Sequence, residues 1–268
     1  MKAEEGRMEN TNAPALRREH AAILATLLVL AAAAWALLLA QSGMGGLTMG
    51  MGAPLFLAVW VAMMVAMMFP TAAPMILMFD RVAATRRARG RAFVPTWIFV
   101  GAYMTIWTLF GVLAYLLALA ATSLAERSMA LMEHAARIGG GVLIVAGLYQ
   151  LSPLKQACLT KCRTPLTFIM SAWRDGHGGA VRMGLEHGLY CLGCCWLLFV
   201  ILFPLGMMNV AAMALITLLI FAEKALPHGP QVGRVAAAAL IAYGALVVAM
   251  PQLLPTMMTP GMPMDGMG

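Results

Sequence analysis

Residues 54–79 read PLFLAVWVAMMVAMMFPTAAPMILMF, an apolar run without a charged side chain. About 20 consecutive apolar residues are enough for a helix to cross the hydrocarbon core of a bilayer. The whole chain shares this character, because 62% of its 268 residues are hydrophobic and 11% are charged. Ordinary soluble domains carry about 25% charged residues. The sequence therefore predicts an all-α fold, a polytopic bundle of transmembrane helices.

Further apolar segments on both sides of this run bring the predicted number of spans to about seven. They are residues 21–40, 95–122, 136–151, 186–206, 207–222 and 233–250. The range is six to seven, because the count depends on whether residues 186–222 form a hairpin. The predicted organisation is a polar N-terminal segment (1–20), a transmembrane domain (21–250) and a methionine-rich tail (251–268).

Lysine and arginine gather in alternate loops, which is typical of the cytoplasmic side of a membrane protein. Arginines follow the run at 54–79 and further basic residues lie in 152–185, whereas 41–53 and 251–268 contain neither Lys nor Arg. This alternation predicts a cytoplasmic N-terminus and an external C-terminus. The net charge of +7 is then explained by loops beside the lipid bilayer, and no nucleic-acid partner is expected. The sequence also lacks a phosphate-binding glycine loop, which argues against ATP-driven chemistry.

All five cysteines lie between residues 158 and 195, near the predicted cytoplasmic side. His187, Cys191, Cys194 and Cys195 share an arc of about 100° on one helix. Neighbours at i,i+4 on this arc can approach one ion together. Thiolate and imidazole groups bind Cu(I) and Zn(II), so the four residues are a candidate metal site. The alternative is that small thiols simply pack well inside the bundle.

A second cysteine motif, C-x-x-x-C, is formed by Cys158 and Cys162. Lys155, Lys161 and Arg163 flank it, and nearby positive charge favours the thiolate that metals need. The pair could join the first cluster as one site or serve as a separate entry or exit station. It could equally belong to a short amphipathic helix on the cytoplasmic surface.

Most of the 25 methionines lie away from the cysteines. Four of them form a candidate relay within the run at 54–79, namely Met63, Met64, Met67 and Met68. Two prolines follow them and predict a kink. Thioethers are soft ligands for Cu(I) and cannot form disulfides, so methionine suits the external side while cysteine suits the reducing cytosol. Flexible core packing is the alternative for these methionines, and the tail either captures Cu(I) or has no role.

A few polar residues fall near the predicted ends of the spans. They are Gln150, Asn209, Glu223 and Lys224. Polar and ionisable residues at membrane depth often belong to functional sites. Glu223 and Lys224 lie close to the predicted interface, however, and we interpret them as ordinary interfacial anchors.

Three motifs occur together in the region 54–250: MMxAMMxPxxxPM at 63–75, CLxxCRxP at 158–165 and HGxxCxGCCW at 187–196. The combination resembles a family of uncharacterised bacterial proteins described as predicted metal-binding integral membrane proteins. The resemblance implies a multi-span helical fold in the bacterial cytoplasmic (inner) membrane. It also implies metal binding by residues in the motifs, Cys158, Cys162, His187, Cys191, Cys194 and Cys195. It supplies no known activity.

The favoured function is a membrane protein that binds a soft transition metal, most plausibly Cu(I) with Zn as the other candidate, and transfers or transports it. Its expected partners are the lipid bilayer, the metal ion, and proteins that donate or accept the metal. An enzyme is less favoured, and we assign no catalytic residue. The alternative is a thiol–disulfide redox protein that uses the C-x-x-C pair Cys191 and Cys194. A membrane scaffold or assembly factor with purely structural sulphur is the second alternative.

Overall fold

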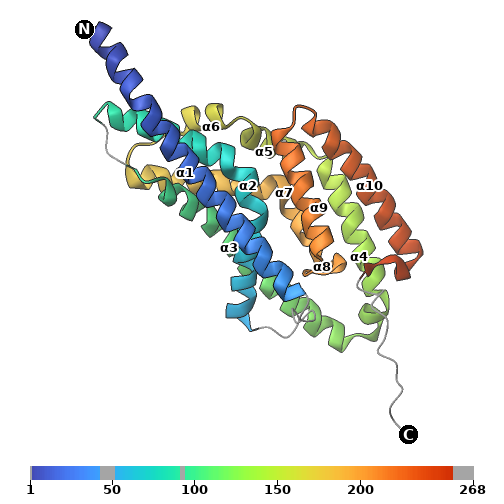
Figure 1. Cartoon of the computed structure of the whole chain (residues 1–268). Helices are drawn as coiled ribbons and strands as arrows, with labels where there is room; N and C mark the ends of the chain where they lie inside the picture. Colours follow the sequence, from blue (N-terminus) through green and yellow to red (C-terminus); the bar gives the residue numbers. More distant parts are fainter. Residues whose placement is uncertain (1, 43–51, 91–93, 256–268) are drawn as a thin grey trace.

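The computed structural model describes residues 2–42, 52–90 and 94–255, and every regular element in these residues is a helix. The elements are α1 (Lys2–Ser42), α2 (Ala53–Ala88), α3 (Thr96–Arg127), α4 (Met129–Gln150), α5 (Pro153–Arg163), α6 (Pro165–Ala172), α7 (Gly176–Val200), α8 (Leu202–Leu205), α9 (Val210–Ala225), α10 (Gly229–Ala249) and the 3-10 turn η2 (Pro251–Leu253). Figure 1 shows them as one bundle, with α1 along its side. The predicted all-α class is confirmed. Residues 256–268, with most of the predicted tail, and the segment 43–51 lie outside the described residues.

Five helices among the described residues are long and apolar enough to cross a membrane. They are Arg18–Gln41 within α1, α2, α3, Gly176–Leu205 spanning α7 and α8, and α10. A sixth is counted if α4 and α5, bent by 62° at their junction, form one broken span. The predicted hairpin over 186–222 has α9 as its second arm, but α9 has 16 residues and is shorter than a typical span. The count of seven therefore stays a prediction.

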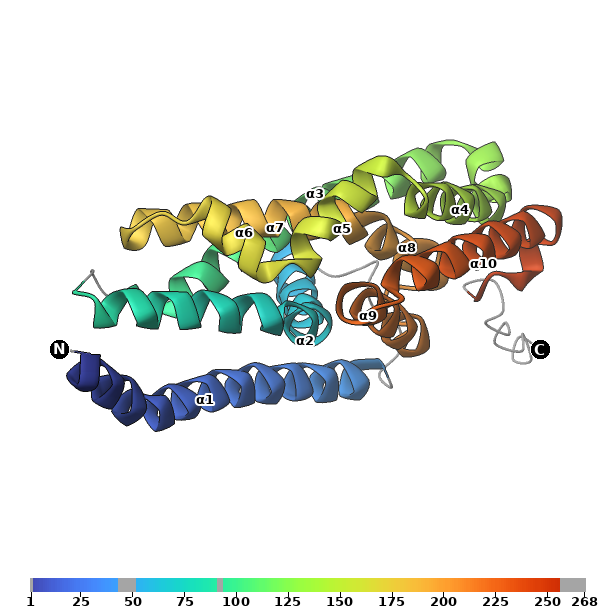
Figure 2. The ribbon, with the colours of Figure 1, turned by 90° about the horizontal axis from the view of Figure 1, so that it is seen from above.

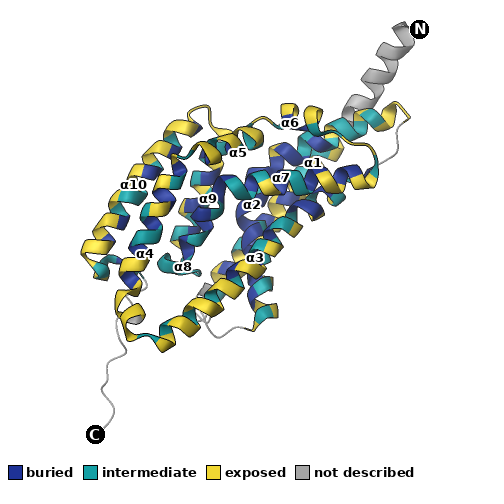
Figure 3. Ribbon diagram, turned by 180° about the vertical axis from the view of Figure 1, so that it is seen from behind, coloured by how far each residue is buried: buried dark blue, intermediate teal, exposed yellow. Residues whose placement is uncertain are grey.

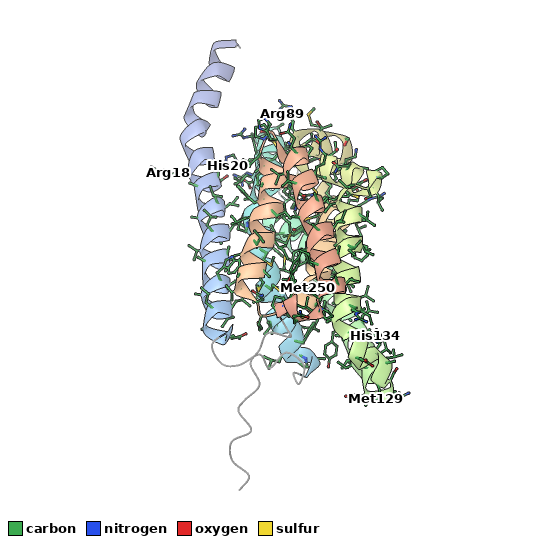
Figure 4. All side chains as sticks on the ribbon, turned by 90° about the vertical axis from the view of Figure 1, so that its right-hand side faces the viewer. Arg18, His20, Arg89, Met129, His134 and Met250 are labelled. Carbon is green, nitrogen blue, oxygen red and sulfur yellow. The ribbon has the colours of Figure 1, made fainter. Side chains whose placement is uncertain are left out.

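Basic residues gather at one end of the helix bundle. Figure 4 places Arg18, His20 and Arg89 toward one end of the bundle, and Met129 at the other. At the basic end the His20 ring lies 3.2 Å from a carboxylate oxygen of Asp80 at the end of α2. This grouping agrees with the alternation of basic loops in the sequence. The side of the membrane that each end faces remains a prediction.

α2 is the central helix of the bundle. In its most apolar window 61% of the residues are buried, against 17% to 22% in α1, α3 and α10. Figure 3 shows buried residues along α2, with exposed faces on α3 and α10. A helix buried on all sides carries its apolar residues all around, which explains the unbroken apolar run at 54–79. The outer helices instead expose large apolar side chains, as expected beside lipid.

Two prolines, Pro70 and Pro74, lie inside α2, which continues through both. In Figure 2 the first part of α2 is seen nearly end-on and the later part lies across the view, so the helix changes direction. A proline leaves the carbonyl four residues earlier without its helical donor. For Pro70 this is the Ala66 carbonyl, which accepts a hydrogen bond of 3.1 Å from the indole N–H of Trp35 on α1. The kink predicted from the sequence is thus stabilised by a neighbouring helix.

The glycines of α4 let its backbone approach α10. A β-carbon at Gly140 would come within 2.9 Å of the Gly244 carbonyl oxygen, and one at Gly147 would come within 2.8 Å of the Ala237 carbonyl oxygen. Small residues allow such close approach between membrane helices. α4 and α10 therefore pack closely, beside the helices that carry the cysteines.

Candidate metal centre

The thiol of Cys191 lies at the centre of the candidate site. Its residue is fully buried in the middle of α7. The hydroxyl of Tyr103 on α3 lies 3.2 Å from its sulphur, and the ammonium of Lys224 on α9 donates to the same sulphur at 3.1 Å. A cation this close stabilises negative charge on sulphur, because a charge-assisted hydrogen bond is stronger than a neutral one.

The two cysteine motifs meet at this point. Cys162 on α5 lies near enough to Cys191 and Cys194 on α7 for the charges of these thiols to influence one another. Cys158, one turn earlier on α5, lies over Gly193, where a β-carbon would come within 2.7 Å of its sulphur. The absence of a side chain at Gly193 therefore allows α5 to approach α7. The two cysteine motifs thus lie close together, and whether they form one metal site or two stays a prediction.

α5 owes its position to local capping and to a buried ion pair. Ser152 caps the helix by accepting from the Lys155 amide at 3.1 Å, and a proline occupies the first turn; both favour a helix start here. The Lys155 ammonium lies 2.7 Å from a carboxylate oxygen of Glu223 on α9, and their side chains are 0% and 2% exposed. The Gln150 amide donates to the other Glu223 oxygen at 2.9 Å, and its own oxygen accepts from Lys155.

Cys194 and Cys195 are turned back onto their own helix. Both thiols donate to the Cys191 carbonyl oxygen, at 3.1 and 2.9 Å. Consistent with this, no group of three or more His, Cys, Asp or Glu side chains in the described part of the chain is arranged to hold a metal ion. A metal bound here by Cys194 or Cys195 would require that thiol to release the Cys191 carbonyl, a change of side-chain rotamer.

His187 lies one turn before Cys191 and is 3% exposed. It is stacked on Phe99 and Tyr103 of α3, with ring centroids 5.9 and 5.3 Å away. Within the described residues neither of its ring nitrogens has a hydrogen-bond partner. Buried polar atoms are nearly always paired, so an unpaired imidazole calls for an explanation such as an absent ion or water. An imidazole and neighbouring thiols are a donor set that fits a soft metal.

Lys224 and Glu223, interpreted from the sequence as interfacial anchors, both have partners inside the bundle. Glu223 is 1% exposed and pairs with Lys155, while Lys224 contacts Cys191. Sequence reasoning also missed Tyr103, which looks like an ordinary aromatic residue of a span. The signal that could have identified Glu223 and Lys224 is the rule that ionisable residues within apolar helices often belong to functional sites.

The position of Cys191 also changes the case for redox chemistry. The predicted span began at residue 186, which would place Cys191 near a helix start where a thiolate is activated. In the structure α7 begins at Gly176, so Cys191 lies in the helix interior and this premise is wrong. The positive charge near its sulphur comes instead from Lys224.

The four methionines of the candidate relay are all inside the bundle. Met63 is 2% exposed, and Met64, Met67 and Met68 are 0% exposed. They belong to the main apolar core together with the three buried cysteines of α7. Burial of this kind fits both a methionine-lined path and core packing.

Taken together, these features define a class of protein: a helical bundle with helices able to cross a membrane and, on α7, three buried thiols near a buried imidazole without a hydrogen-bond partner among the described residues. The chain belongs to the PpoB2 family, described as copper chaperones, whose family model matches residues 57–247. The matched region contains both cysteine motifs, His187 and the methionines of α2. No curated protein and no solved structure matches the chain.

Proposed function

We propose that this chain is a copper chaperone of the bacterial cytoplasmic membrane that holds Cu(I) between α5 and α7. Cys162 and Cys191 are the central ligands, and His187, Cys194, Cys195 and Cys158 are the candidates to complete the site. The observation that carries the proposal is the buried Cys191 thiol, which accepts from Lys224 at 3.1 Å on the helix that α5 approaches closely at Gly193. The match to a copper chaperone family supports copper as the cargo.

The charge of Lys224 favours a monovalent ion at this site. Two thiolates and one Cu(I) carry a net charge of minus one, which the Lys224 ammonium neutralises. The same ligands around a divalent ion such as Zn(II) would leave a net positive charge. Uncompensated charge is costly to bury, so the site should prefer Cu(I).

The direct test is Cu(I) binding to the full chain, purified without oxygen in detergent, in competition with a chromogenic chelator. Cys191→Ser and Cys162→Ser should each weaken the binding by at least about tenfold, equivalent to ~1.4 kcal/mol. Met129→Leu is the matched control, because Met129 is also a soft ligand but is 84% exposed at the opposite end. Unchanged binding in Cys191→Ser, with thermal unfolding showing an intact fold, would exclude this site.

The redox and scaffold alternatives are distinguished by whether the cysteine thiols are reduced in cells and by whether they are needed for function. Mass spectrometry after alkylation in cells should find the cysteines reduced in a metal chaperone, whereas a redox protein would show a disulfide between Cys191 and Cys194. A scaffold with structural sulphur would keep its cellular function after all five cysteines are replaced by serine.

The membrane arrangement is tested by labelling introduced cysteines from each side. Arg89→Cys and Met129→Cys, placed in a chain without native cysteines, should react with an impermeant reagent from opposite sides of the membrane. Arg89 should be reached from the cytoplasm, because it follows the arginines of α2. Labelling of both from the same side would contradict the proposed span of α3.

A further inference from the structure

We propose a second Cu(I) site, built only from thioethers, where the turn between α8 and α9 meets α2. It rests on the proposed function, because copper is taken as the cargo, but it uses none of the cysteines. Met63 on α2 and Met207 and Met208 in the turn line one small cavity. The turn lies at the end of α7 and α8 that points away from the basic loops (Figure 1).

The cavity has the size of a single small occupant. Its volume is about 10 Å³ for the centre of a water-sized sphere, close to the minimum needed to hold one water. A buried water also needs two to four polar partners. The other lining residues are Leu38, Phe56, Val59 and Trp60, and the one polar group among these side chains, the Trp60 indole N–H, already donates to the Trp107 carbonyl at 3.0 Å. The cavity therefore does not suit water.

The remaining donors among the lining residues are the thioethers of Met63, Met207 and Met208. Thioethers are neutral and soft, and they select Cu(I) over hard cations that prefer oxygen. Because thioethers are neutral, they cannot neutralise the positive charge of the ion as two thiolates do. This site should therefore bind Cu(I) more weakly than the cysteine site, as expected of a position from which the ion is released.

The turn that carries two of these methionines is held in place by its own hydrogen bonds. Asn209 accepts from the Ala212 amide at 3.1 Å and donates to the Leu205 carbonyl at 3.1 Å. Gly206 has a φ of +95°, a conformation that other residues rarely adopt. Asn209, noted in the sequence as a polar residue at this turn, thus fixes the loop that presents Met207 and Met208 to α2.

The test is Cu(I) titration of the full chain in detergent, carried out between about pH 5 and 8. A thioether has no proton to lose, so Cu(I) bound by methionine alone should show an affinity that does not change with pH. Thiolate ligands compete with protons, and their apparent affinity should fall as the pH falls. We expect wild type to show a tight class that depends on pH and a weaker class that does not.

Met207→Leu/Met208→Leu should weaken the class that is independent of pH by at least about tenfold and leave the tight class unchanged. Met75→Leu is the control, since Met75 is 2% exposed on the same helix as Met63. Because the double variant could perturb the turn, Met63→Leu is measured beside it, and each fold is checked by thermal unfolding. Wild-type binding in both methionine variants, or no class independent of pH in wild type, would overturn the proposal.

The two proposals fail separately. In Cys162→Ser/Cys191→Ser the tight class should vanish while the class independent of pH remains. If this variant binds no Cu(I) at all, the cysteine site is supported and the thioether site is excluded. If Cu(I) binding is lost only when Met63, Met207 and Met208 are replaced, the thioether site is supported and the cysteine site is excluded.

Discussion

Replacing Lys155 by methionine should both destabilise the protein and weaken Cu(I) binding at Cys162. Lys155 and Glu223 lie 2.7 Å apart with side chains 0% and 2% exposed. At an effective dielectric constant of ~20 their attraction is about 6 kcal/mol, and the loss of hydration of two buried ions offsets much of it. Removing one partner leaves the other charge buried and unpaired, which costs about 3–5 kcal/mol.

The affected region is the one that positions the candidate site. Glu223 lies on α9, and its backbone carbonyl also accepts from Arg163 at the end of α5 at 2.6 Å. Loss of the ion pair should therefore let α5 move away from α7 and carry Cys162 away from Cys191. We expect the affinity for Cu(I) to fall by at least about tenfold.

The assay is the free energy of unfolding in mixed detergent micelles, measured beside the Cu(I) affinity. Lys161→Met is the control, because Lys161 lies on the same helix but is exposed. Lys155→Met/Glu223→Gln removes both charges and should recover most of the stability lost in the single variant. The reasoning would be refuted if Lys155→Met cost less than about 1 kcal/mol, or if the double variant were no more stable than the single one.

Three further predictions concern single contacts. Lys224→Leu should reduce the preference for Cu(I) over Zn(II) by at least about tenfold, since the positive charge beside Cys191 is lost. Competition between the two metals measures it, and an unchanged ratio would contradict the charge argument. Trp35→Phe should lower the free energy of unfolding by about 1–3 kcal/mol, because the Ala66 carbonyl loses its hydrogen-bond donor. Unfolding in detergent measures this change, and an unchanged free energy would argue against the hydrogen bond from Trp35 to Ala66. His187→Phe should weaken Cu(I) binding without lowering thermal stability, because the aromatic stacking is kept and the ring nitrogens have no partner to lose. Lower stability with unchanged binding would mark the ring as structural.

The all-α fold class could be predicted from local sequence, because a run as long and apolar as 54–79 indicates a membrane-spanning helix. The kink of α2 followed from Pro70 and Pro74 in the same way. The number of spans did not follow, because α9 has 16 residues and because α4 and α5 meet at a bend of 62°. Hydropathy alone does not reveal whether such short or bent segments cross a bilayer.

The residues of the candidate site could be selected from the sequence, but how they come together could not. Spacing of three and four residues placed His187 beside Cys191 on one helix, since helical periodicity is a local property. That Cys162 faces Cys191 depends on the packing of α5 on α7 at Gly193. Lys224 could not be assigned, because its partner is 33 residues earlier in the chain and no local pattern joins them.

The order of the helices has a consequence for how the protein is made. The contacts of Cys191 come from α3, α5 and α9, and α9 is the last of these to leave the ribosome. Until α9 is inserted, Cys191 lacks the ammonium of Lys224, and α5 lacks the Glu223 carboxylate that anchors it. A growing chain therefore carries the cysteines before it has the contacts that position them, so the proposed site cannot form until the protein is nearly complete.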